Sequence, residues 1–433
     1  MAISAKSKNI FVVGLDDHNL GELKTIHHAD RFTFHKLLDV EEVTKSGHYD
    51  MEAMFRKAAD ELDAFDGSID AIIGFWDFPV SLMVPLLSER FGTVGPTLES
   101  ALKCEHKYWS RLEQTKWLGH HVPAVSPVNP FADDPFSTVD VAFPFWLKPV
   151  KAHSSWLGFR IENREQFNCA IEDIRDKIGR FAEPFNFFLS QIELPAEVAE
   201  VDGHWCVAEE ILSGDQCTLS GYVFGGDIHS YGLVDSLYYS EFHSFLRYRY
   251  PSEQPEELKL RMAEISTNIM ARIGFDNSPF NIEFLYDRDR DTTKLLEINT
   301  RISQSHADLY AKVEGASNHQ VLVDIATGQK PEIPRGRGRY RTASKLQHRV
   351  FTNGTVIRVP DEAQIKKVRE TFPGTIVLVE VEPGQRLSEL ENQDAYSYRL
   401  AVIYMGAEDD ETLMENYRQC IDMLDFEIDE AES

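Results

Sequence analysis

Residues 294–306, KLLEINTRISQSH, decide the fold. Their β-branched and apolar content is typical of a strand, yet every second residue is polar. Because successive side chains of an extended chain point to opposite faces, Glu297, Asn299 and Arg301 are expected on one face. The other face is expected to carry Leu296, Ile298, Thr300 and Ile302. A row of carboxylate, amide and guanidinium groups predicts either a solvated sheet edge or a binding site.

A second strand pattern, FNIEFLYD at 280–287, precedes this row and is joined to it by the charged turn RDRDTT. If the two strands pair antiparallel, Glu283 lies beside Glu297 and Asn299, with an apolar face packed behind them: Phe280, Ile282 and Phe284. Neighbouring carboxylates repel one another unless a cation neutralises them. Mg²⁺ is bound by carboxylates together with nucleotide phosphates. The predicted metal ligands are therefore Glu283, Glu297 and Asn299, with Mn²⁺ as an alternative ion.

Composition limits the class of protein. The chain has 433 residues, 42% of them hydrophobic, which is enough for two or three cores because single domains usually stop growing near ~250 residues. A formal charge of -27 argues against a nucleic-acid partner, since DNA affinity comes largely from cations. The five cysteines show no metal-binding or disulfide-rich spacing. The first apolar run is too short for a signal peptide, and the most apolar window is interrupted by Asp77 and two prolines. We expect a cytoplasmic protein without a membrane partner.

The order of patterns predicts three units of mixed α/β and α+β class. Strands alternate with helices over residues 1–100, which predicts a parallel α/β domain. A helix is expected from about Leu98 to Trp117, and Gly225 to Asp227 should form a hairpin turn. Between the basic stretch and the acidic last 27 residues (407–433) the sequence reads as short strands around one helix, and the acidic tail reads as a solvated final helix. Residues 331–433 are therefore expected to be a C-terminal α+β unit. Its basic stretch at 335–349 is either a connector or a surface for anions.

Four segments in order resemble the ATP-grasp superfamily, across roughly residues 100–328. EINTRISQSH (297–306) is similar to its metal-binding strand, and ESALKCEHKYWSRLEQTKWLGHHVP (99–123) to the helix whose lysine, Lys107, reaches the nucleotide phosphates. FPFWLKPVKAHSSWLG (143–158) resembles the strand with the second nucleotide lysine, Lys148, and the loop over the phosphates. VAEEILSGDQ (207–216) is similar to the adenine hinge. The resemblance implies an N-terminal pre-ATP-grasp domain at 1–100 and an ATP-grasp domain at 101–330, with a lid at about 145–210.

The resemblance also assigns nucleotide contacts. Glu209 would accept from the exocyclic amine of adenine, and the backbone of Glu210, Ile211 and Leu212 would contact the ring. Gln216 stands where many members place a glutamate for the ribose hydroxyls. The phosphate loop departs from the family because its only glycine is Gly158. The hydroxyls of Ser154 and Ser155 would replace backbone donors there, and Lys151 or His153 would add positive charge.

The implied activity is an ATP-dependent carboxylate–amine ligase. Such enzymes convert a carboxylate into an acyl phosphate, which an amine then attacks, and Arg301 would hold the acyl phosphate and the developing oxyanion. In YYSEFHSFLRYRYP (238–251), Arg247 and Arg249 would share a strand face and could clamp a substrate carboxylate, with Ser303 as a further pocket residue. The partners would be a small acid, amino-acid-like or peptide-like, and an amine; a homodimer is left open.

Two alternatives remain. One is a carboxylase that activates bicarbonate, like biotin carboxylase, although the glycine-rich loop is missing and VDSLYYSEF (234–242) replaces the run which that family carries after its hinge. The other is an ATP-binding regulator without turnover, although Glu283, Glu297 and Asn299 are all present.

Overall fold

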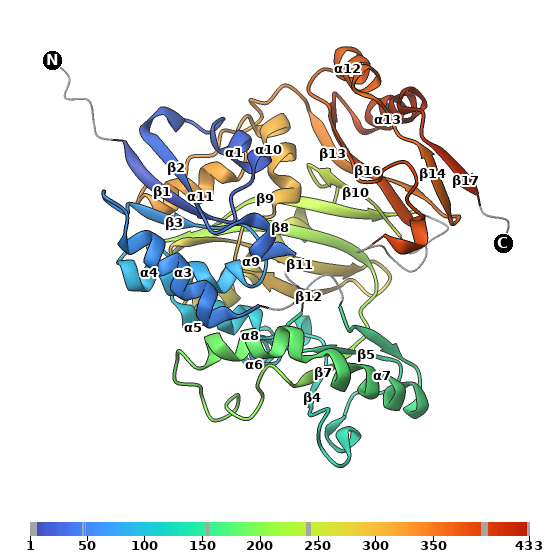
Figure 1. Cartoon of the computed structure of the whole chain (residues 1–433). Helices are drawn as coiled ribbons and strands as arrows, with labels where there is room; N and C mark the ends of the chain where they lie inside the picture. The colour runs from blue at the N-terminus through green and yellow to red at the C-terminus, as the bar shows by residue number, and fades with distance from the viewer. Residues whose placement is uncertain are drawn as a thin grey trace.

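The computed structural model describes residues 7–45, 47, 49–152, 156–239, 244–390 and 397–430. A central sheet joins an N-terminal unit, a lid below it and a C-terminal unit (Figure 1). Within the described residues, no helix is both long and apolar enough to cross a membrane. The predicted contributions of Ser154, Ser155 and His153 lie outside these residues.

The N-terminal unit is a parallel sheet with strand order β2-β1-β3, as the alternating pattern predicts. Its strands are β1 (Lys8–Val13), β2 (Phe32–Leu37) and β3 (Ala71–Ile73). Its helices are α1 (Asp17–Leu23), α2 (Val40–Thr44), α3 (Met51–Asp63) and α4 (Val80–Phe91). Residues 10–13 of β1 and all three residues of β3 are buried.

The helix expected from Leu98 to Trp117 is in fact two helices, α5 (Leu98–Glu105) and α6 (Lys107–Leu118). His106 breaks it, with φ −80° and ψ 101°, and its imidazole accepts from the backbone N–H of Trp109 as an N-cap. The other ring nitrogen lies 2.7 Å from the carbonyl oxygen of Val201. Periodicity alone does not show this break, because the long-range contact with Val201 stabilises it.

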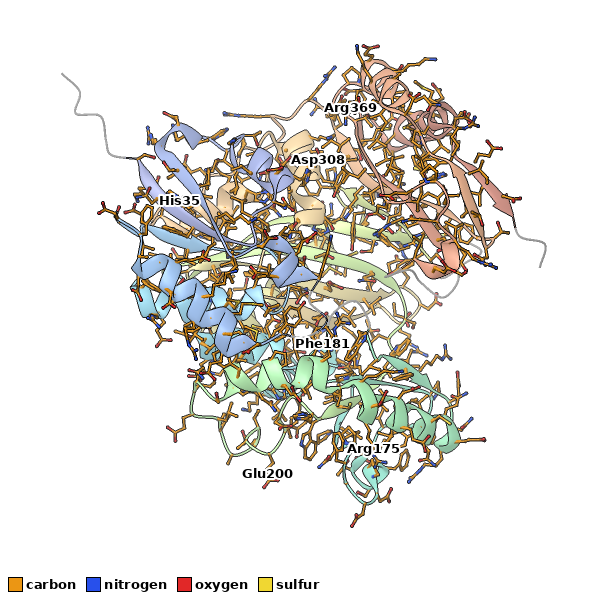
Figure 2. All side chains as sticks on the ribbon, in the orientation of Figure 1. His35, Arg175, Phe181, Glu200, Asp308 and Arg369 are labelled. Carbon is orange, nitrogen blue, oxygen red and sulfur yellow. The ribbon has the colours of Figure 1, made fainter. Side chains whose placement is uncertain are left out.

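The lid is a four-stranded antiparallel sheet with order β4-β7-β5-β6. Its strands are β4 (Val125–Val128), β5 (Phe145–Pro149), β6 (Phe159–Ile161) and β7 (Cys206–Glu210), so it starts before the predicted residue 145. Helices α7 (Arg164–Lys177) and α8 (Gly179–Leu189) cover it. Phe181 of α8 lies on the side of the lid that faces the other units (Figure 2), and its ring is 6.2 Å from that of Phe78. The lid therefore shares an aromatic core with the N-terminal unit.

The central sheet has eight strands in the order β12-β11-β8-β9-β10-β13-β16-β15. The strands before residue 300 are β8 (Asp215–Phe224), β9 (Asp227–Tyr238), β10 (Phe245–Tyr250), β11 (Ser278–Asp287) and β12 (Thr292–Asn299). The predicted hairpin turn is confirmed: Gly225 and Gly226 join β8 to β9, both with the positive φ that such two-residue turns require. Helix α9 (Glu256–Ile273) packs on one face through an apolar cluster. Helices α10 (Ala307–Glu314) and α11 (His319–Ala326) pack on part of the other face.

The C-terminal unit continues the same sheet with β13 (Thr342–Val350), β15 (Ile376–Val379) and β16 (Tyr398–Ala407). The predicted boundary at residue 330 therefore falls between strands of one sheet. Strands β14 (Gly354–Arg358) and β17 (Glu427–Glu430) form a separate pair. The helix expected between the basic stretch and the acidic tail is α12 (Glu362–Thr371), and the final helix expected in the acidic tail is α13 (Asp410–Leu424). Short 3₁₀ turns lie at Ala29–Arg31, Gly119–His121, Pro135–Thr138, Gln304–His306 and Leu387–Glu389.

Candidate functional site

The predicted pairing of the two polar strands is confirmed. Glu283 of β11 lies directly opposite Glu297 of β12, and Asn281 lies opposite Asn299. Behind them the predicted apolar residues are fully buried: Phe280, Ile282 and Phe284. Since β11 also pairs with β8 on its other edge, this polar row lies at the margin of the central sheet, next to the lid.

The expected position of Leu296 on the apolar face is wrong. A bulge follows the Glu283–Glu297 pair, so that Phe284 faces Leu295, and Leu295 takes the buried position. The carbonyl oxygen of Leu296 instead accepts from Arg111 Nη2 at 2.6 Å. The bulge thus ties the polar strand to helix α6.

The two glutamates have opposite electrostatic environments. Burial, and then the charge of Glu297, raise the pKa of Glu283 to about 7. Burial also acts to raise the pKa of Glu297, but Lys107 and Lys151 outweigh it and lower that pKa. Gln216 donates to Glu283 at 2.8 Å, and Lys107 lies 3.4 Å from Glu297. Glu297 therefore has a cation partner within the chain, whereas Glu283 lacks a close cation partner among the described residues.

The donor set fits a hard divalent cation. Two carboxylates on directly opposed residues, with the side-chain oxygen of the neighbouring Asn299 3.4 Å from Arg301, are oxygen groups of the kind that Mg²⁺ prefers. The amide nitrogen of Asn299 lies 3.5 Å from Glu283. The shortage of positive charge around Glu283 is the condition that a bound cation would relieve. Among the described residues, no group of three or more His, Cys, Asp or Glu has a metal-holding arrangement, so any site here depends on the asparagine as third ligand.

Lys107 reaches this row because the helix breaks just before it. As the first residue of α6, it donates its backbone N–H to the carbonyl of Val150 and its Nζ to the carbonyl of Ala152 at 3.1 Å. Burial lowers its pKa from the ordinary value, with Glu297 opposing that effect. The predicted phosphate lysine is thus held between Glu297 and the end of β5.

Lys148 and Glu209 form a buried cluster with Arg111, which sequence reasoning did not nominate. Lys148 Nζ lies 2.5 Å from one oxygen of Glu209, and Arg111 Nε lies 2.6 Å from the other. Burial alone would raise the pKa of Glu209, but the two cations hold it at about 2. The prediction that Glu209, rather than Glu210, faces inward is confirmed, since Glu209 is 2% exposed. A signal was available, because Lys107 and Arg111 are four residues apart on one helix face.

The rest of the predicted hinge follows β7. The amide N–H of Glu210 donates to Ala124, and its carboxylate lies 3.5 Å from Lys294. Ile211 and Leu212 are partly buried and connect β7 to β8. Gln216, expected at the ribose, donates to Glu283 and accepts from Tyr238, whose side chain is exposed. Gln216 therefore links Tyr238 to Glu283.

Arg301 is held by a carboxylate of the N-terminal unit. Its Nη2 lies 2.7 Å from Asp77 and 3.4 Å from the side-chain oxygen of Asn299. Asp77 also pairs with Lys151, which in turn pairs with the buried Glu105. Lys151, expected to add charge to the phosphate loop, is therefore engaged inside the protein. Asp77 was not nominated, although it follows strand β3, and the carboxyl ends of parallel strands are where sites gather.

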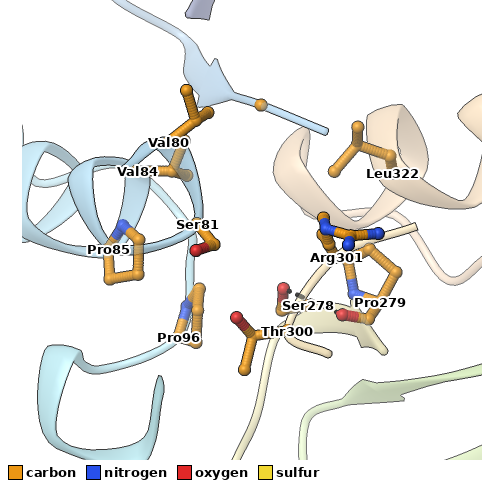
Figure 3. Close-up of a pocket in the computed structure, with 11 residues that line it drawn as sticks. Val80, Ser81, Val84, Pro85, Pro96, Ser278, Pro279, Thr300, Arg301 and Leu322 are labelled. Atoms are coloured by element: carbon orange, nitrogen blue, oxygen red, sulfur yellow. Dashed lines mark hydrogen bonds between the residues drawn. The ribbon is translucent and has the colours of Figure 1, made fainter. Parts of the chain in front are cut away.

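A small cavity lies beside Arg301 (Figure 3). It is about 30 Å³ in volume and lies between helix α4 and the ends of β11 and β12. Its lining is mostly apolar, with Val80, Val84 and Pro279 among its residues. This volume is about that of one water molecule, so the cavity is a packing gap and not a substrate pocket.

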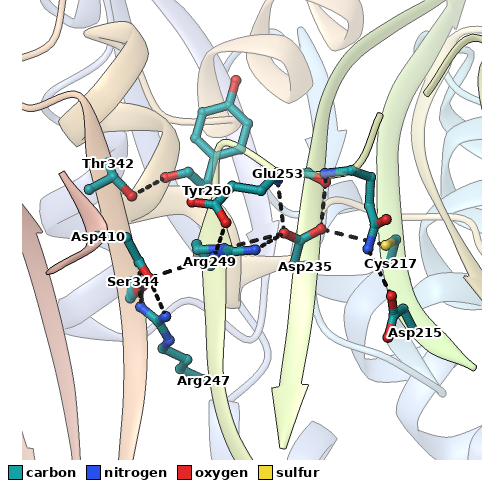
Figure 4. Close-up of polar contacts among 12 residues, drawn as sticks. Asp215, Cys217, Asp235, Arg247, Arg249, Tyr250, Glu253, Thr342, Ser344 and Asp410 are labelled. Atoms are coloured by element: carbon teal, nitrogen blue, oxygen red, sulfur yellow. Dashed lines mark hydrogen bonds and ion pairs between the residues drawn. The ribbon is translucent and has the colours of Figure 1, made fainter. Parts of the chain in front are cut away.

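Arg247 and Arg249, predicted as a substrate clamp, both pair with carboxylates of the chain. Arg247 makes two contacts of 2.7 Å with Asp410, and Arg249 lies 2.7 Å from Asp235, so both guanidiniums are neutralised within the chain (Figure 4). They do share a strand face, but it is the face covered by α9, opposite the glutamate row. Tyr248, between them, points to the side of the glutamates. Ser303 lies at the start of the turn Gln304–His306, and its carbonyl accepts from Asn318.

The comparisons with known proteins agree on one architecture. A family described as carbamoyl-phosphate synthase L chain, ATP binding domain, matches residues 251–333. No curated protein sequence gave a significant match. Solved structures match over nearly the whole chain. An L-amino acid ligase from Bacillus licheniformis has a TM-score of 0.74 at 17% identity, covering 99% of this chain and 100% of that one.

Two further structures carry nucleotides. A carboxyaminoimidazole ribonucleotide synthase from Aspergillus clavatus, complexed with ATP, has a TM-score of 0.65 at 14% identity, over 96% of this chain and 98% of that one. The biotin carboxylase domain of 2-oxoglutarate carboxylase from Hydrogenobacter thermophilus, in complex with MgADP and bicarbonate, has a TM-score of 0.60 at 14% identity, over 98% and 91%. At these identities the likeness establishes the fold.

Proposed function

We propose that this chain, which has the ATP-grasp fold, is an ATP-dependent ligase that joins a small carboxylate to an amine. The observation that carries the proposal is the Glu283–Glu297 pair, opposed in register, with Lys107 3.4 Å from Glu297. The charge of Arg301 also acts on Glu283, and that of Lys148 acts on Glu297. A triphosphate needs both elements: oxygen ligands for its metal ion and ammonium groups for its own oxygens.

The reaction has two balanced steps. A carboxylate oxygen of the acid attacks the γ-phosphorus of ATP, and the bond from that phosphorus to the β–γ bridging oxygen breaks, which releases ADP. The amine nitrogen then attacks the acyl carbon, the carbon–oxygen bond to phosphate breaks, and the nitrogen loses a proton. The products are an amide, ADP and phosphate.

The chain's own residues position these groups. Lys107 and Lys148 would bind the triphosphate oxygens as point charges, and Arg301 would hold the acyl phosphate with a planar, bidentate guanidinium. Asp77 fixes the orientation of Arg301 through their 2.7 Å contact. Mg²⁺, when bound by Glu283, Glu297 and Asn299, would neutralise charge on the phosphoryl group in transfer. Positioning of this kind supplies most of the rate in phosphoryl transfer.

The adenosine end would lie along the hinge. The resemblance places adenine against Glu209 and the backbone of 210–212, and the ribose against Gln216. Two contacts support this proposal: Gln216 donates to Glu283, and Glu209 pairs with Lys148. Tyr238, exposed beside Gln216, provides an aromatic surface next to this path. We also propose a cytoplasmic setting, because the five cysteines show no disulfide-rich spacing.

ADP release tests the proposal. Purified protein with ATP and Mg²⁺ is offered a panel of small acids and amines, and ADP is measured by a coupled assay. ADP that requires both an acid and an amine is the expected result. Bicarbonate-dependent ADP would identify a carboxylase instead, and nucleotide binding without ADP from any mixture would identify a regulator. Lys366→Met is a suitable control variant, because Lys366 is exposed on α12, away from the site.

A further inference from the structure

Lys345 is a cation on the same face of the central sheet as the glutamate row. Lys345 of β13 lies opposite Tyr248 of β10. Tyr248 in turn lies opposite Ser236 of β9, and Ser236 lies opposite Gln216 of β8. Directly opposed residues share a face, and Gln216 contacts Glu283. Lys345 and the proposed metal ligands therefore border one continuous surface, on the side that the proposed reaction uses.

Lys345 has no acid partner within 4 Å in the part of the chain that the structure describes. Its Nζ donates to Ser305 Oγ at 2.8 Å and lies 5.6 Å from the ring centre of Tyr404. Glu380, the nearby acid, is paired with Arg399. The partly or fully buried lysines around it differ, since each has a carboxylate partner: Lys107, Lys148, Lys151 and Lys312. A desolvated ammonium without a counter-ion is costly, so its presence points to an anion from outside.

The position of Lys345 relative to Arg301 indicates which anion this is. His306 is fully buried, its ring packs 4.8 Å from Tyr248, and Lys345 and Arg301 both lie close enough to disfavour its charged form. Its Nδ1 has no hydrogen-bond partner among the described groups. Ser305, which Lys345 contacts at 2.8 Å, comes four residues after Arg301 in the same segment. Arg301 would be occupied by the acyl phosphate, which leaves Lys345 for a second anionic group.

We propose that Lys345 and Ser305 bind the carboxylate of the amine substrate, so that the nucleophile is an amino acid rather than a simple amine. This inference rests on the proposed ligase function and adds the class of its second substrate. Ser305 Oγ accepts from Lys345, so its own hydrogen is available to donate to a carboxylate. The carboxylate would receive one charge-assisted and one neutral hydrogen bond. The amide product then keeps a free carboxylate.

Hydroxylamine separates the two proposals, because this neutral nucleophile traps an acyl phosphate as a hydroxamate without needing an anion site. The wild type, Lys345→Met, Ser305→Ala and the control Lys366→Met are assayed with each acid, once with hydroxylamine and once with an amino acid. The same amino acid is also supplied as its carboxamide, which keeps the amine and removes the charge. Thermal denaturation checks the fold of each variant, and Ser305→Ala carries the test if Lys345→Met does not fold.

The expected result is selective loss of the amino acid. Lys345→Met should raise the KM for the amino acid about 10- to 100-fold, the usual value of a hydrogen bond to a charged group, with kcat and the KM for the acid changed less than threefold. Ser305→Ala should raise it about three- to tenfold, and the wild type should prefer the amino acid to its carboxamide. No hydroxamate from the wild type would refute the ligase itself. Hydroxamate together with an unchanged amino-acid KM would refute the role of Lys345. If Lys345→Met instead raised the KM for the acid, Lys345 would bind the acid substrate and not the amine substrate. If it lowered kcat alone, Lys345 would act as a proton acceptor. Either outcome overturns the inference.

Discussion

Replacing Glu209 with glutamine tests whether the lysine and arginine beside it are held by its charge. The substitution keeps the shape of the side chain and removes the carboxylate that contacts Arg111 at 2.6 Å and Lys148 at 2.5 Å. Glu209 and Arg111 are 2% and 5% exposed, so their pair is dry, whereas Lys148 is 22% exposed and can regain water. We expect the loss to fall mainly on Arg111.

Two independent arguments give the same loss in the free energy of unfolding for Glu209→Gln. Removing one partner of a buried ion pair typically costs about 3–5 kcal/mol, and the partial exposure of Lys148 favours the lower end. The pKa of Glu209 is held at about 2, against about 4.5 in the unfolded chain, and this difference corresponds to about 3 kcal/mol at neutral pH. Because the folded pKa is depressed, this stability is complete above pH 4.5 and is lost as the pH falls toward 2.

The assay is guanidinium denaturation followed by tryptophan fluorescence, with Trp146 directly opposite Glu209 on β5. Glu210→Gln is the matched control, because the neighbouring carboxylate is 43% exposed and its contact with Lys294 is 3.5 Å. We expect the control to cost less than about 1 kcal/mol, as exposed pairs do. If Glu209→Gln destabilises the protein no more than Glu210→Gln, the charge cluster does not hold the hinge.

Three further substitutions address other parts of the site. Glu297→Ala should abolish Mg²⁺-dependent ADP formation while leaving the thermal unfolding temperature within a few degrees of the wild type; undiminished turnover would remove the metal assignment. Arg301→Lys should lower kcat at least tenfold and change the Kd for ATP less than threefold, since one ammonium cannot replace a bidentate guanidinium; equal losses in calorimetry and kinetics would make the arginine structural. Burial lowers the pKa of His106 to about 4, below its unfolded value near 6.5, so the unfolded state takes up a proton first and stability falls on acidification. His106→Asn should therefore reduce by about 2 kcal/mol the stability lost between pH 7 and pH 5, as measured by denaturation at each pH; identical pH slopes would contradict this.

Side-chain alternation predicted the core of the site correctly. The pairing of 280–287 with the 294–306 row, and the buried face behind it, follow from the period of two in extended chains. The resemblance to the ATP-grasp superfamily is confirmed at the level of the fold by the structural matches. It also ordered Lys107, Lys148 and Glu209 along the chain, and the structure pairs Lys107 with Glu297 and Lys148 with Glu209.

The errors share a physical cause, since each depends on a contact distant in sequence. The bulge at Leu296 is fixed by Arg111, and the break at His106 by the carbonyl of Val201. Local pattern contains neither contact. Alternation showed that Arg247 and Arg249 share a face, but it could not show which face, because that depends on strand order across the sheet. Asp77 was missed for a different reason, because its place after a buried parallel strand was a usable signal in the sequence.

The most direct test of the account is a crystal structure with a non-hydrolysable ATP analogue and Mn²⁺, which is located by its anomalous scattering. The account predicts a metal peak within coordination distance, roughly 2–2.3 Å, of oxygens from Glu283 and Glu297, beside the β- and γ-phosphates. Lys107 and Lys148 should contact the phosphate oxygens. A nucleotide bound elsewhere, or bound here with no metal peak at these residues, would contradict it.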